Sequence, residues 1–437
     1  MIKFYNRRNE LAILANAKKA SLTQSQMTII TGRRRIGKTR LILKATEKDK
    51  FIYLFVARKN ESLLCREFIE EVSQKLDIPV IGKINSFSKL FEFLLIQAQS
   101  QSFTLAIDEF QEFFNINSSV YSDMQNMWDR YKHSSKMNLL LSGSIYSMMK
   151  KIFENTKEPL FGRANEKISL KPFNINVLKH ILKDEYPAFK KEDILAFYIM
   201  TGGVAKYVEW FVQKKAFTLS KMLNELLREN SLLLDEGKNL LIEEFGKDYT
   251  TYFSILSLIA SSKTSRSEIE SILEKNVGGY LDRLEKDYGI IKVIKPFLSK
   301  PGGRVQKYVI EDNFLNFWFR FIYKNRSAIE IGNFDYIKKI VHRDFKTYSG
   351  RLLEKYFLEK LSLTNKYSQI SSYWERNNKN EIDIVGVNET DKKLLLAEVK
   401  LNEEKFNKNI LLEKSARLIK RFRDYDIQFR LFSLKDM

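Results

Sequence analysis

The chain has 437 residues, of which 44% are hydrophobic and 29% charged, and only six are proline. This composition excludes disordered and collagen-like proteins, and the length predicts about three or four domains, because single cores seldom exceed ~250 residues. The formal net charge of +20 favours a polyanionic partner, nucleic acid before a membrane surface, with lysine-rich solvated faces as the alternative explanation.

The cysteine and histidine content indicates the compartment and the class of metal. Cys65 is the single cysteine, so a disulfide framework within the chain is excluded and a cytoplasmic location is expected. The three histidines lack zinc-site spacing, so Mg²⁺ with oxygen ligands is the metal expected. The N-terminus lacks the apolar segment of a signal peptide, and no run of about 18 apolar residues occurs, so no membrane partner is expected.

Residues 32–39 form a complete G-x-x-x-x-G-K-[ST] phosphate loop between a β-branched apolar run at 27–31 and a helix-prone segment at 40–45. The NH groups of such a loop and the positive end of the next helix hold phosphates. Lys38 is expected to reach the β- and γ-phosphates and Thr39 to bind Mg²⁺, the alternative being a glycine turn without a ligand. The ATP-binding residues predicted here are Gly32, Arg33, Arg34, Arg35, Ile36, Gly37, Lys38 and Thr39.

Residues 103–110 predict a buried strand that ends in two acids, the pattern known as Walker B. Asp108 is expected to bind ATP-associated Mg²⁺, and Glu109 to orient and deprotonate the attacking water, whereas a solvated acidic turn is the alternative. The next apolar strand, at 137–144, carries two serines, Ser142 and Ser144, that could sense the γ-phosphate. Further segments extend this pattern: a strand at 52–56 and helices at 63–76 and 86–99. The alternation predicts a P-loop α/β domain.

Several motifs together resemble the archaeal-type ATPase family, a branch of the AAA+/STAND-related P-loop ATPases. They are FYNRRNEL at 4–11, the phosphate loop, AIDEFQ at 106–111, LSGS at 141–144 and PLFGR at 159–163, followed by a strand at 166–173. The resemblance implies that Asn6 and Arg7 lie near the adenine. It also implies that Arg163 is an arginine finger or sensor, acting within its own chain or in trans in a homo-oligomer, with a solvated loop arginine as the alternative.

The middle of the chain is predicted to be helical and then to form a winged helix. Helical periodicity predicts a lid over 174–248, with helices at 193–200 and 219–234, and the turn at 201–205 resembles the family's Gly-Gly-x-Pro sensor turn with alanine in place of proline. Three short helices and two strands follow within 249–325, and the aromatic stretch 313–322 is expected to be core.

The winged helix leaves DNA binding and protein contact open as alternatives. Its candidate recognition helix, 280–286, carries two acids and two bases, which disfavours direct base reading. Phosphate contact through Lys300, Arg304 and Lys307 of the wing is expected instead. Ser265 and Glu268 fit a capping box at the start of the second helix.

The last segment contains the order E…D…ExK, with Glu354 in a predicted helix at 351–361, Asp383 in a strand at 381–387, and Glu398 and Lys400 in a strand at 394–400. Alternate residues of a strand share a face, so the last two can converge with Asp383. Asp383 and Glu398 are expected to bind Mg²⁺, Lys400 to stabilise negative charge and Glu354 to support the metal. The pattern resembles the PD-(D/E)XK nuclease superfamily; solvated strands or an inactive binding domain are the alternatives.

The predicted fold class is therefore α/β, with a P-loop parallel sheet, a helical lid, a winged helix and a C-terminal α/β nuclease-like domain. The predicted domains are 1–173, 174–248, 249–325 and 326–437. The expected function is ATP binding and hydrolysis whose nucleotide state controls a DNA-binding, Mg²⁺-dependent nuclease module, with DNA favoured over RNA. The alternative is an ATP-switched signalling or scaffold protein with a catalytically inactive tail.

Overall fold

The computed structural model describes residues 3–78, 84–246, 249–300, 302–303 and 305–437. The chain divides into two compact units. The first unit is Asn6–Lys171, and the second is Pro172–Met437 together with the N-terminal residues up to Tyr5. The boundaries predicted after residues 248 and 325 fall within the second unit and stay predictions.

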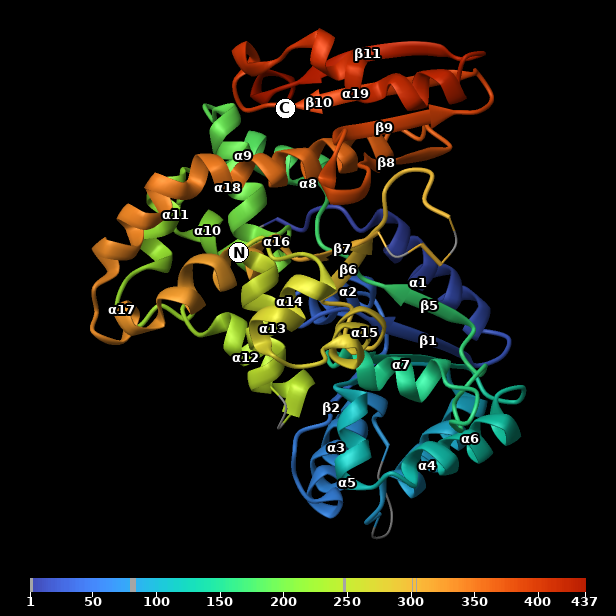
Figure 1. The fold of residues 1–437 in the computed structure, drawn as a ribbon. Coiled ribbons are helices and arrows are strands. Elements are labelled where there is room, and N and C mark those ends of the chain that lie inside the picture. Colours follow the sequence, from blue (N-terminus) through green and yellow to red (C-terminus); the bar gives the residue numbers. More distant parts are fainter. Residues whose placement is uncertain (1–2, 79–83, 247–248, 301, 304) are drawn as a thin grey trace. The chain divides into compact units, whose positions relative to one another are not determined.

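The first unit is built on a parallel five-stranded sheet of order β2-β3-β4-β1-β5 (Figure 1). Its strands are β1 Gln26–Thr31, β2 Phe51–Phe55, β3 Phe103–Asp108, β4 Met137–Gly143 and β5 Glu166–Ser169. Its helices are α1 Arg8–Ser21, α2 Lys38–Ala45, α3 Glu61–Leu76, α4 Phe87–Ser100, α5 Phe113–Ile116, α6 Val120–Tyr131 and α7 Tyr146–Glu154. The predicted parallel P-loop sheet is confirmed.

The central strands of this sheet are apolar because both of their faces are covered. Every residue of β1, β3 and β4 is buried, as expected for a parallel sheet between helical layers. Edge strand β2 alternates instead: Ile52 and Leu54 enter the core formed with α3, α4 and α6, and Tyr53 between them lies on the other face. This alternation brings a phenol to the side of the sheet that carries the phosphate loop.

The second unit begins with five helices, α8 Ile175–Glu185, α9 Lys191–Thr201, α10 Ala205–Gln213, α11 Leu219–Leu226 and α12 Glu236–Phe245. The helix predicted at 219–234 was wrong in its second half. The chain leaves the helix after Leu226, takes a positive φ at Asn230, and closes the loop with a bond from Ser231 Oγ to the carbonyl of Glu225. Asparagine tolerates this left-handed conformation better than most residues.

The turn between α9 and α10 requires glycine. Gly202 and Gly203 both have positive φ, and a Cβ atom at Gly203 would lie 2.2 Å from the carbonyl oxygen of Phe173. Phe173 in turn donates its NH to the carbonyl of Gly203 at 2.7 Å. The contacts of this turn therefore explain the Gly-Gly pair through packing within the second unit.

Three helices and an antiparallel hairpin follow in the order expected of a winged helix. They are α13 Tyr249–Ala260, α14 Arg266–Leu273, α15 Gly278–Lys286, β6 Ile291–Ile294 and β7 Lys307–Ile310. The predicted capping box between Ser265 and Glu268 is confirmed at the start of α14. Next come α16 Asn313–Phe317, a π-helical turn over Trp318–Ile322 and α17 Arg326–Glu330. The aromatic side chains of this stretch are buried, so their predicted role as core is confirmed.

The C-terminal part combines the 29-residue helix α18, Phe334–Ser362, with a mixed four-stranded sheet of order β11-β10-β9-β8 (Figure 1). Its other elements are β8 Gln369–Tyr373, β9 Ile382–Asn388, β10 Lys393–Val399, α19 Lys408–Arg421 and β11 Asp426–Phe432. Among the described strand pairs of this sheet, β10–β11 is parallel, and β9–β10 and β8–β9 are antiparallel. Short 3₁₀ turns lie at Phe110–Glu112, Tyr323–Asn325, Arg376–Asn378, Glu403–Lys405 and Leu434–Asp436. Across the described ranges, no helix combines the length and apolar character needed to span a membrane.

Candidate functional sites

The phosphate loop leaves β1 at the carboxyl edge of the sheet and enters α2 at Lys38. Gly32 and Gly37 have positive φ, and Arg35 between them also adopts the left-handed region. A Cβ atom at Gly32 would lie 2.9 Å from the carbonyl oxygen of Leu170, so the close approach of two backbone segments requires glycine there. Alternating right- and left-handed residues turn successive NH groups into one concavity, which is the backbone feature that binds phosphate.

Lys38 is buried at the start of α2, within this loop. Its Nζ donates to the carbonyl of Gly32 at 2.9 Å and to that of Arg33 at 3.4 Å. Burial lowers the pKa of Lys38, and the carboxylates of Glu109 and Asp108 oppose that shift. An ammonium group held by backbone carbonyls beside two acids is suited to exchange those carbonyls for phosphate oxygens.

Asp108 ends β3 beside the loop and accepts four hydrogen bonds. Its Oδ2 accepts from Thr39 Oγ1 at 3.0 Å and from Tyr53 Oη at 2.6 Å. Its Oδ1 accepts from the hydroxyl of Ser142 and from the backbone NH of Glu109 at 3.0 Å. The predicted pair Thr39 and Asp108 is thus brought together, and their hard oxygen atoms fit Mg²⁺, which retains waters and takes few protein ligands.

Glu109 follows with a left-handed backbone, and two donors hold its carboxylate. Ser144 Oγ and Gln111 Nε2 each lie 2.6 Å from Glu109 Oε2. Gln111 is fully buried and also lies 3.5 Å from Glu112. The two serines predicted as γ-phosphate sensors therefore contact the two acids: Ser142 contacts Asp108, and Ser144 contacts Glu109.

Asn6 and Arg7 precede α1, and both have positive φ. Arg7 is buried and donates to Glu10 at 3.2 Å and to the carbonyl of Lys171 at 2.7 Å. Since Lys171 follows β5 past its carboxyl end, Arg7 lies at the same edge of the sheet as the phosphate loop. This location suits the predicted contact with the nucleotide base, which stays a prediction.

Arg163 lies at the opposite edge of the sheet. Its guanidinium donates to Asp129 at 2.9 and 3.1 Å, and nearby Asn165 exchanges hydrogen bonds with Met27 at the start of β1. The phosphate loop begins about 16 Å further along this strand, at ~3.3 Å per residue, which exceeds the reach of an arginine side chain. This distance does not favour action of Arg163 on its own phosphate loop, so action in trans and the alternative of a loop arginine without a catalytic role both stay predictions.

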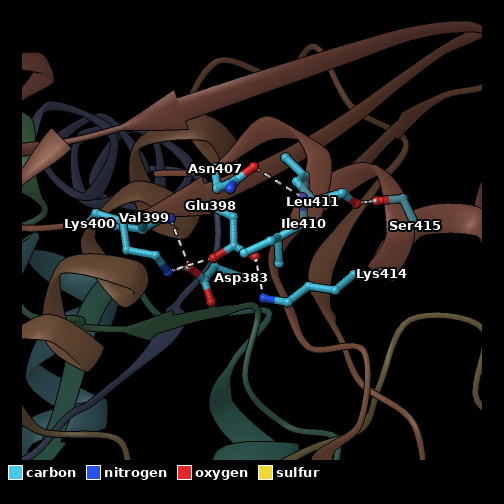
Figure 2. A network of polar contacts seen from close by, with 9 residues as sticks. All are labelled: Asp383, Glu398, Val399, Lys400, Asn407, Ile410, Leu411, Lys414 and Ser415. Atoms are coloured by element: carbon cyan, nitrogen blue, oxygen red, sulfur yellow. Dashed lines mark hydrogen bonds and ion pairs between the residues drawn. The ribbon is translucent and has the colours of Figure 1, made fainter. Parts of the chain in front are cut away.

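The C-terminal charged cluster consists of Asp383, Glu398, Lys400 and Lys414 (Figure 2). Lys400 Nζ lies 2.5 Å from Glu398 Oε2 and 3.3 Å from Asp383 Oδ2, and the latter oxygen also accepts from the NH of Val399 at 2.7 Å. Lys414 Nζ donates to Glu398 Oε1 at 2.9 Å. Three of the four predicted residues therefore converge, with two ammonium groups on Glu398.

Glu354, the fourth predicted residue, interacts with this cluster through charge. Burial, followed by the nearby charges of Asp383 and Glu381, raises the pKa of Glu354 to about 8. Burial and the charge of Glu398 also raise the pKa of Asp383. Burial disfavours the ammonium of Lys400, but Asp383 and Glu398 outweigh it and raise its pKa.

The sequence analysis did not predict Lys414 as a member of this cluster, although its position in the helical pattern indicates a buried partner. Asn407 caps the start of α19 by accepting bonds from the NH groups of residues 409 and 410, and Figure 2 shows the bond from Ile410. Lys414 then stands three residues after buried Leu411 and four before buried Leu418, on the face that packs on the sheet. A lysine at such an otherwise apolar position predicts a buried anionic partner.

The acidic groups do not form a preassembled metal cage. Among the residues that the structure describes, no group of three or more histidine, cysteine, aspartate or glutamate side chains is placed to hold a metal ion. The oxygens of Asp383 and Glu398 have the right chemistry for Mg²⁺, but the Lys400 ammonium contacts both. The residues thus fit a metal at this cluster only if Lys400 moves.

The wing is engaged with the C-terminal sheet. Lys307 pairs with Glu381 at 2.7 Å and lies 4.4 Å from the ring centre of Trp374, while Phe297 of the wing joins the core of that sheet. In this structure Lys307 forms an ion pair within the chain, and its expected contact with phosphate stays a prediction. Lys300 is exposed, whereas Arg304 and Pro301 lie outside the described residues.

Two protein families match this chain. Residues 4–211 match a family described as an ATPase domain predominantly from Archaea, and residues 318–414 match one described as Archaea bacterial proteins of unknown function. Uncharacterized protein MJECL04 of Methanocaldococcus jannaschii is 31% identical over 412 residues, which cover 92% of this chain and 88% of that relative.

Solved structures share the fold at low sequence identity. The Walker-type ATPase PABY2304 of Pyrococcus abyssi has a TM-score of 0.54 and 18% identity, covering 72% of this chain and 96% of its own. The ORC2 protein of Aeropyrum pernix, in ADPNP–ADP complexes, has a TM-score of 0.50 and 14% identity. The match covers 75% of this chain and 96% of the ORC2 chain. The chain therefore belongs to the family of archaeal-type ATPases that join a P-loop ATPase domain to this C-terminal domain of unknown function.

Proposed function

We propose that the Asn6–Lys171 unit binds and hydrolyses ATP. The observation that carries the proposal is the meeting of Thr39 and Asp108, 3.0 Å apart, beside a phosphate loop whose lysine is held at the loop carbonyls. The family assignment of residues 4–211 supports it, as do the ADPNP–ADP complexes of the ORC2 protein whose fold the chain shares.

Each residue of the site has a defined task in this reaction. The loop NH groups and Lys38 bind the β- and γ-phosphates, and Thr39 and Asp108 would hold Mg²⁺, which neutralises phosphate charge when bound. Glu109 accepts a proton from the attacking water, and its bonds from Ser144 and Gln111 orient the carboxylate. Asn6 and Arg7 contact the adenine side.

Two substitutions test the binding and hydrolysis steps separately. Lys38→Ala is expected to abolish binding of a fluorescent ATP analogue, whereas Lys44→Ala, on the same helix but paired with Glu47 at the surface, is the matched control. Glu109→Gln is expected to retain nucleotide binding and slow phosphate release by ~100-fold or more. Equal turnover by the wild type and Glu109→Gln would remove Glu109 from the mechanism.

We also propose that the Arg163 guanidinium acts in trans in a nucleotide-bound homo-oligomer. Its place at the edge of the sheet away from its own loop supports this arrangement. Mixing Arg163→Ala with Lys38→Ala protomers tests it, because only mixed contacts would then pair an intact loop with an intact arginine. If mixing restores no hydrolysis although oligomers form, the trans role is excluded.

The second unit is proposed to bind nucleic acid, DNA before RNA, under control of the nucleotide state. The net charge of +20 and the winged-helix order of α13 to β7 support this proposal. Fluorescence anisotropy with labelled DNA duplexes at several salt concentrations, with ATP analogue, ADP or neither, tests it. Affinity that is independent of both salt and nucleotide would contradict it.

For the C-terminal charged cluster we propose two alternative functions, each supported by a different observation. The convergence of Asp383, Glu398 and Lys400 favours a Mg²⁺-dependent nuclease, whereas the two lysines that already neutralise these acids favour a binding domain without cleavage. Incubation with supercoiled DNA and Mg²⁺ separates them. Nicking that is lost in Asp383→Asn supports the nuclease, and DNA binding without nicking under any nucleotide condition supports the binding domain.

A further inference from the structure

A tyrosine of β2 donates a hydrogen bond to a carboxylate oxygen of the proposed Mg²⁺ site. Tyr53 Oη donates to Asp108 Oδ2 at 2.6 Å, and Thr39 Oγ1 donates to the same oxygen at 3.0 Å. The phenol therefore contacts the acid from the neighbouring strand β2.

The strand geometry fixes this phenol in place. β2 pairs with β3 in parallel, with Tyr53 opposite Ala106 and Phe55 opposite Asp108. Since Ile52 and Leu54 are buried in the core on one face of β2, Tyr53 lies on the other face, the one that carries Asp108.

The donors to Asp108 come from four separate places in the unit. Thr39 belongs to α2, Tyr53 to β2 and Ser142 to β4, and the fourth donor is the NH of Glu109. These four bonds engage both carboxylate oxygens and so fix the carboxylate plane. Thr39 and Tyr53 together orient Oδ2, the oxygen that lies nearest the Thr39 hydroxyl.

We infer that Tyr53 is a positioning residue that orients Asp108 toward the Mg²⁺ of the bound nucleotide, an inference that rests on the proposed ATP site. Tyr53 touches neither nucleotide nor metal in this role. It acts through Asp108, as the partners that surround metal ligands do, and loss of such a partner typically weakens metal affinity or activity by about 10- to 100-fold.

The experiment measures nucleotide affinity with and without Mg²⁺. Tyr53→Phe keeps the ring and removes the hydroxyl, and an ATP analogue is titrated into wild type and variant in EDTA and at increasing Mg²⁺. The expected result is equal affinity in EDTA and a Mg²⁺ requirement raised by about tenfold in the variant. Tyr131→Phe is the matched control, since its hydroxyl donates to Glu92 at 3.1 Å within the same unit.

The outcomes distinguish this inference from the function on which it rests. If wild type gains affinity with Mg²⁺ and Tyr53→Phe gains it at the same Mg²⁺ concentration, the role of Tyr53 is overturned while the ATP site stands. If the wild type binds no nucleotide, the proposed function fails and the inference with it. Affinity reduced equally in EDTA and in Mg²⁺ indicates a structural role of the phenol and likewise overturns the inference.

Discussion

Replacing Glu354 with glutamine tests the electrostatics of the C-terminal cluster. The carboxyl group is half-buried on α18, and its pKa is raised from 4.5 to about 8 by burial and by the charges of Asp383 and Glu381. A carboxyl group whose pKa is higher in the folded than in the unfolded protein binds its proton more tightly when folded. Its contribution to stability is therefore full below about pH 4.5 and is lost as the pH rises through about 8.

The size of the effect follows from this pKa difference. At ~1.4 kcal/mol for each pKa unit, the difference between 4.5 and about 8 corresponds to an upper limit of ~5 kcal/mol. Solvent reaches the half-buried side chain and screens part of this interaction, so we expect about 2 kcal/mol. Glu354→Gln should therefore match wild-type stability near pH 5 and exceed it by about 2 kcal/mol near pH 8.5.

Urea denaturation in EDTA, followed by tryptophan fluorescence between about pH 5 and 8.5, measures this difference. The pKa of Asp383 is also raised, so Asp383 likewise lowers the stability of the folded protein as the pH rises. The Glu354→Gln variant should therefore still lose stability with rising pH, but less than the wild type does. Glu413→Gln is the control, because Glu413 is exposed on α19. Parallel stability curves for wild type and Glu354→Gln would refute the electrostatic reasoning.

Substitutions at three further sites test packing, a buried hydrogen bond and helix capping by the same denaturation assay. Gly143→Ala places a Cβ atom 2.2 Å from Gln111 Oε1 and should destabilise by ~1–3 kcal/mol, and an unchanged midpoint would contradict the tight contact. Trp318→Phe removes the 2.8 Å bond to the Leu234 carbonyl and should cost ~1–3 kcal/mol, whereas a loss below ~0.5 kcal/mol would argue against it. Ser265→Ala should cost ~1 kcal/mol, with Ser265→Thr near wild type; equal losses would exclude capping as the cause.

Local sequence patterns predicted the elements of the ATP site because each pattern maps onto one strand or loop. Asp108 ends β3 and Lys38 lies in the loop that follows β1, and the carboxyl ends of such parallel strands share one edge. The hydrogen bonds across that edge depend on register and strand order, which single segments do not encode. The sequence therefore predicted that Ser142 and Ser144 lie near the phosphates, but not that they donate to Asp108 and Glu109.

Tyr53 was missed for a related physical reason. In an apolar strand a tyrosine is compatible with core packing on either face, and only pairing with β3 shows that its hydroxyl meets Asp108. Arg163 illustrates the converse. Its motif resembled a family element, yet the register of β5 against β1 places it at the edge away from its own loop.

The charges of the C-terminal cluster connect its geometry to the choice between cleavage and binding. Glu354 is mostly protonated near neutral pH. The positive charges of Lys400 and Lys414 then balance the negative charges of Asp383 and Glu398 without a metal ion. A divalent metal ion that enters this cluster would displace Lys400. Its binding free energy must therefore exceed the cost of breaking the ion pairs of Lys400 with Asp383 and Glu398. Phosphate oxygens of a bound nucleic acid are the groups that could draw Lys400 away from its acids. If the second unit binds nucleic acid as proposed, that binding is expected to precede any binding of metal at this cluster, whether or not cleavage follows.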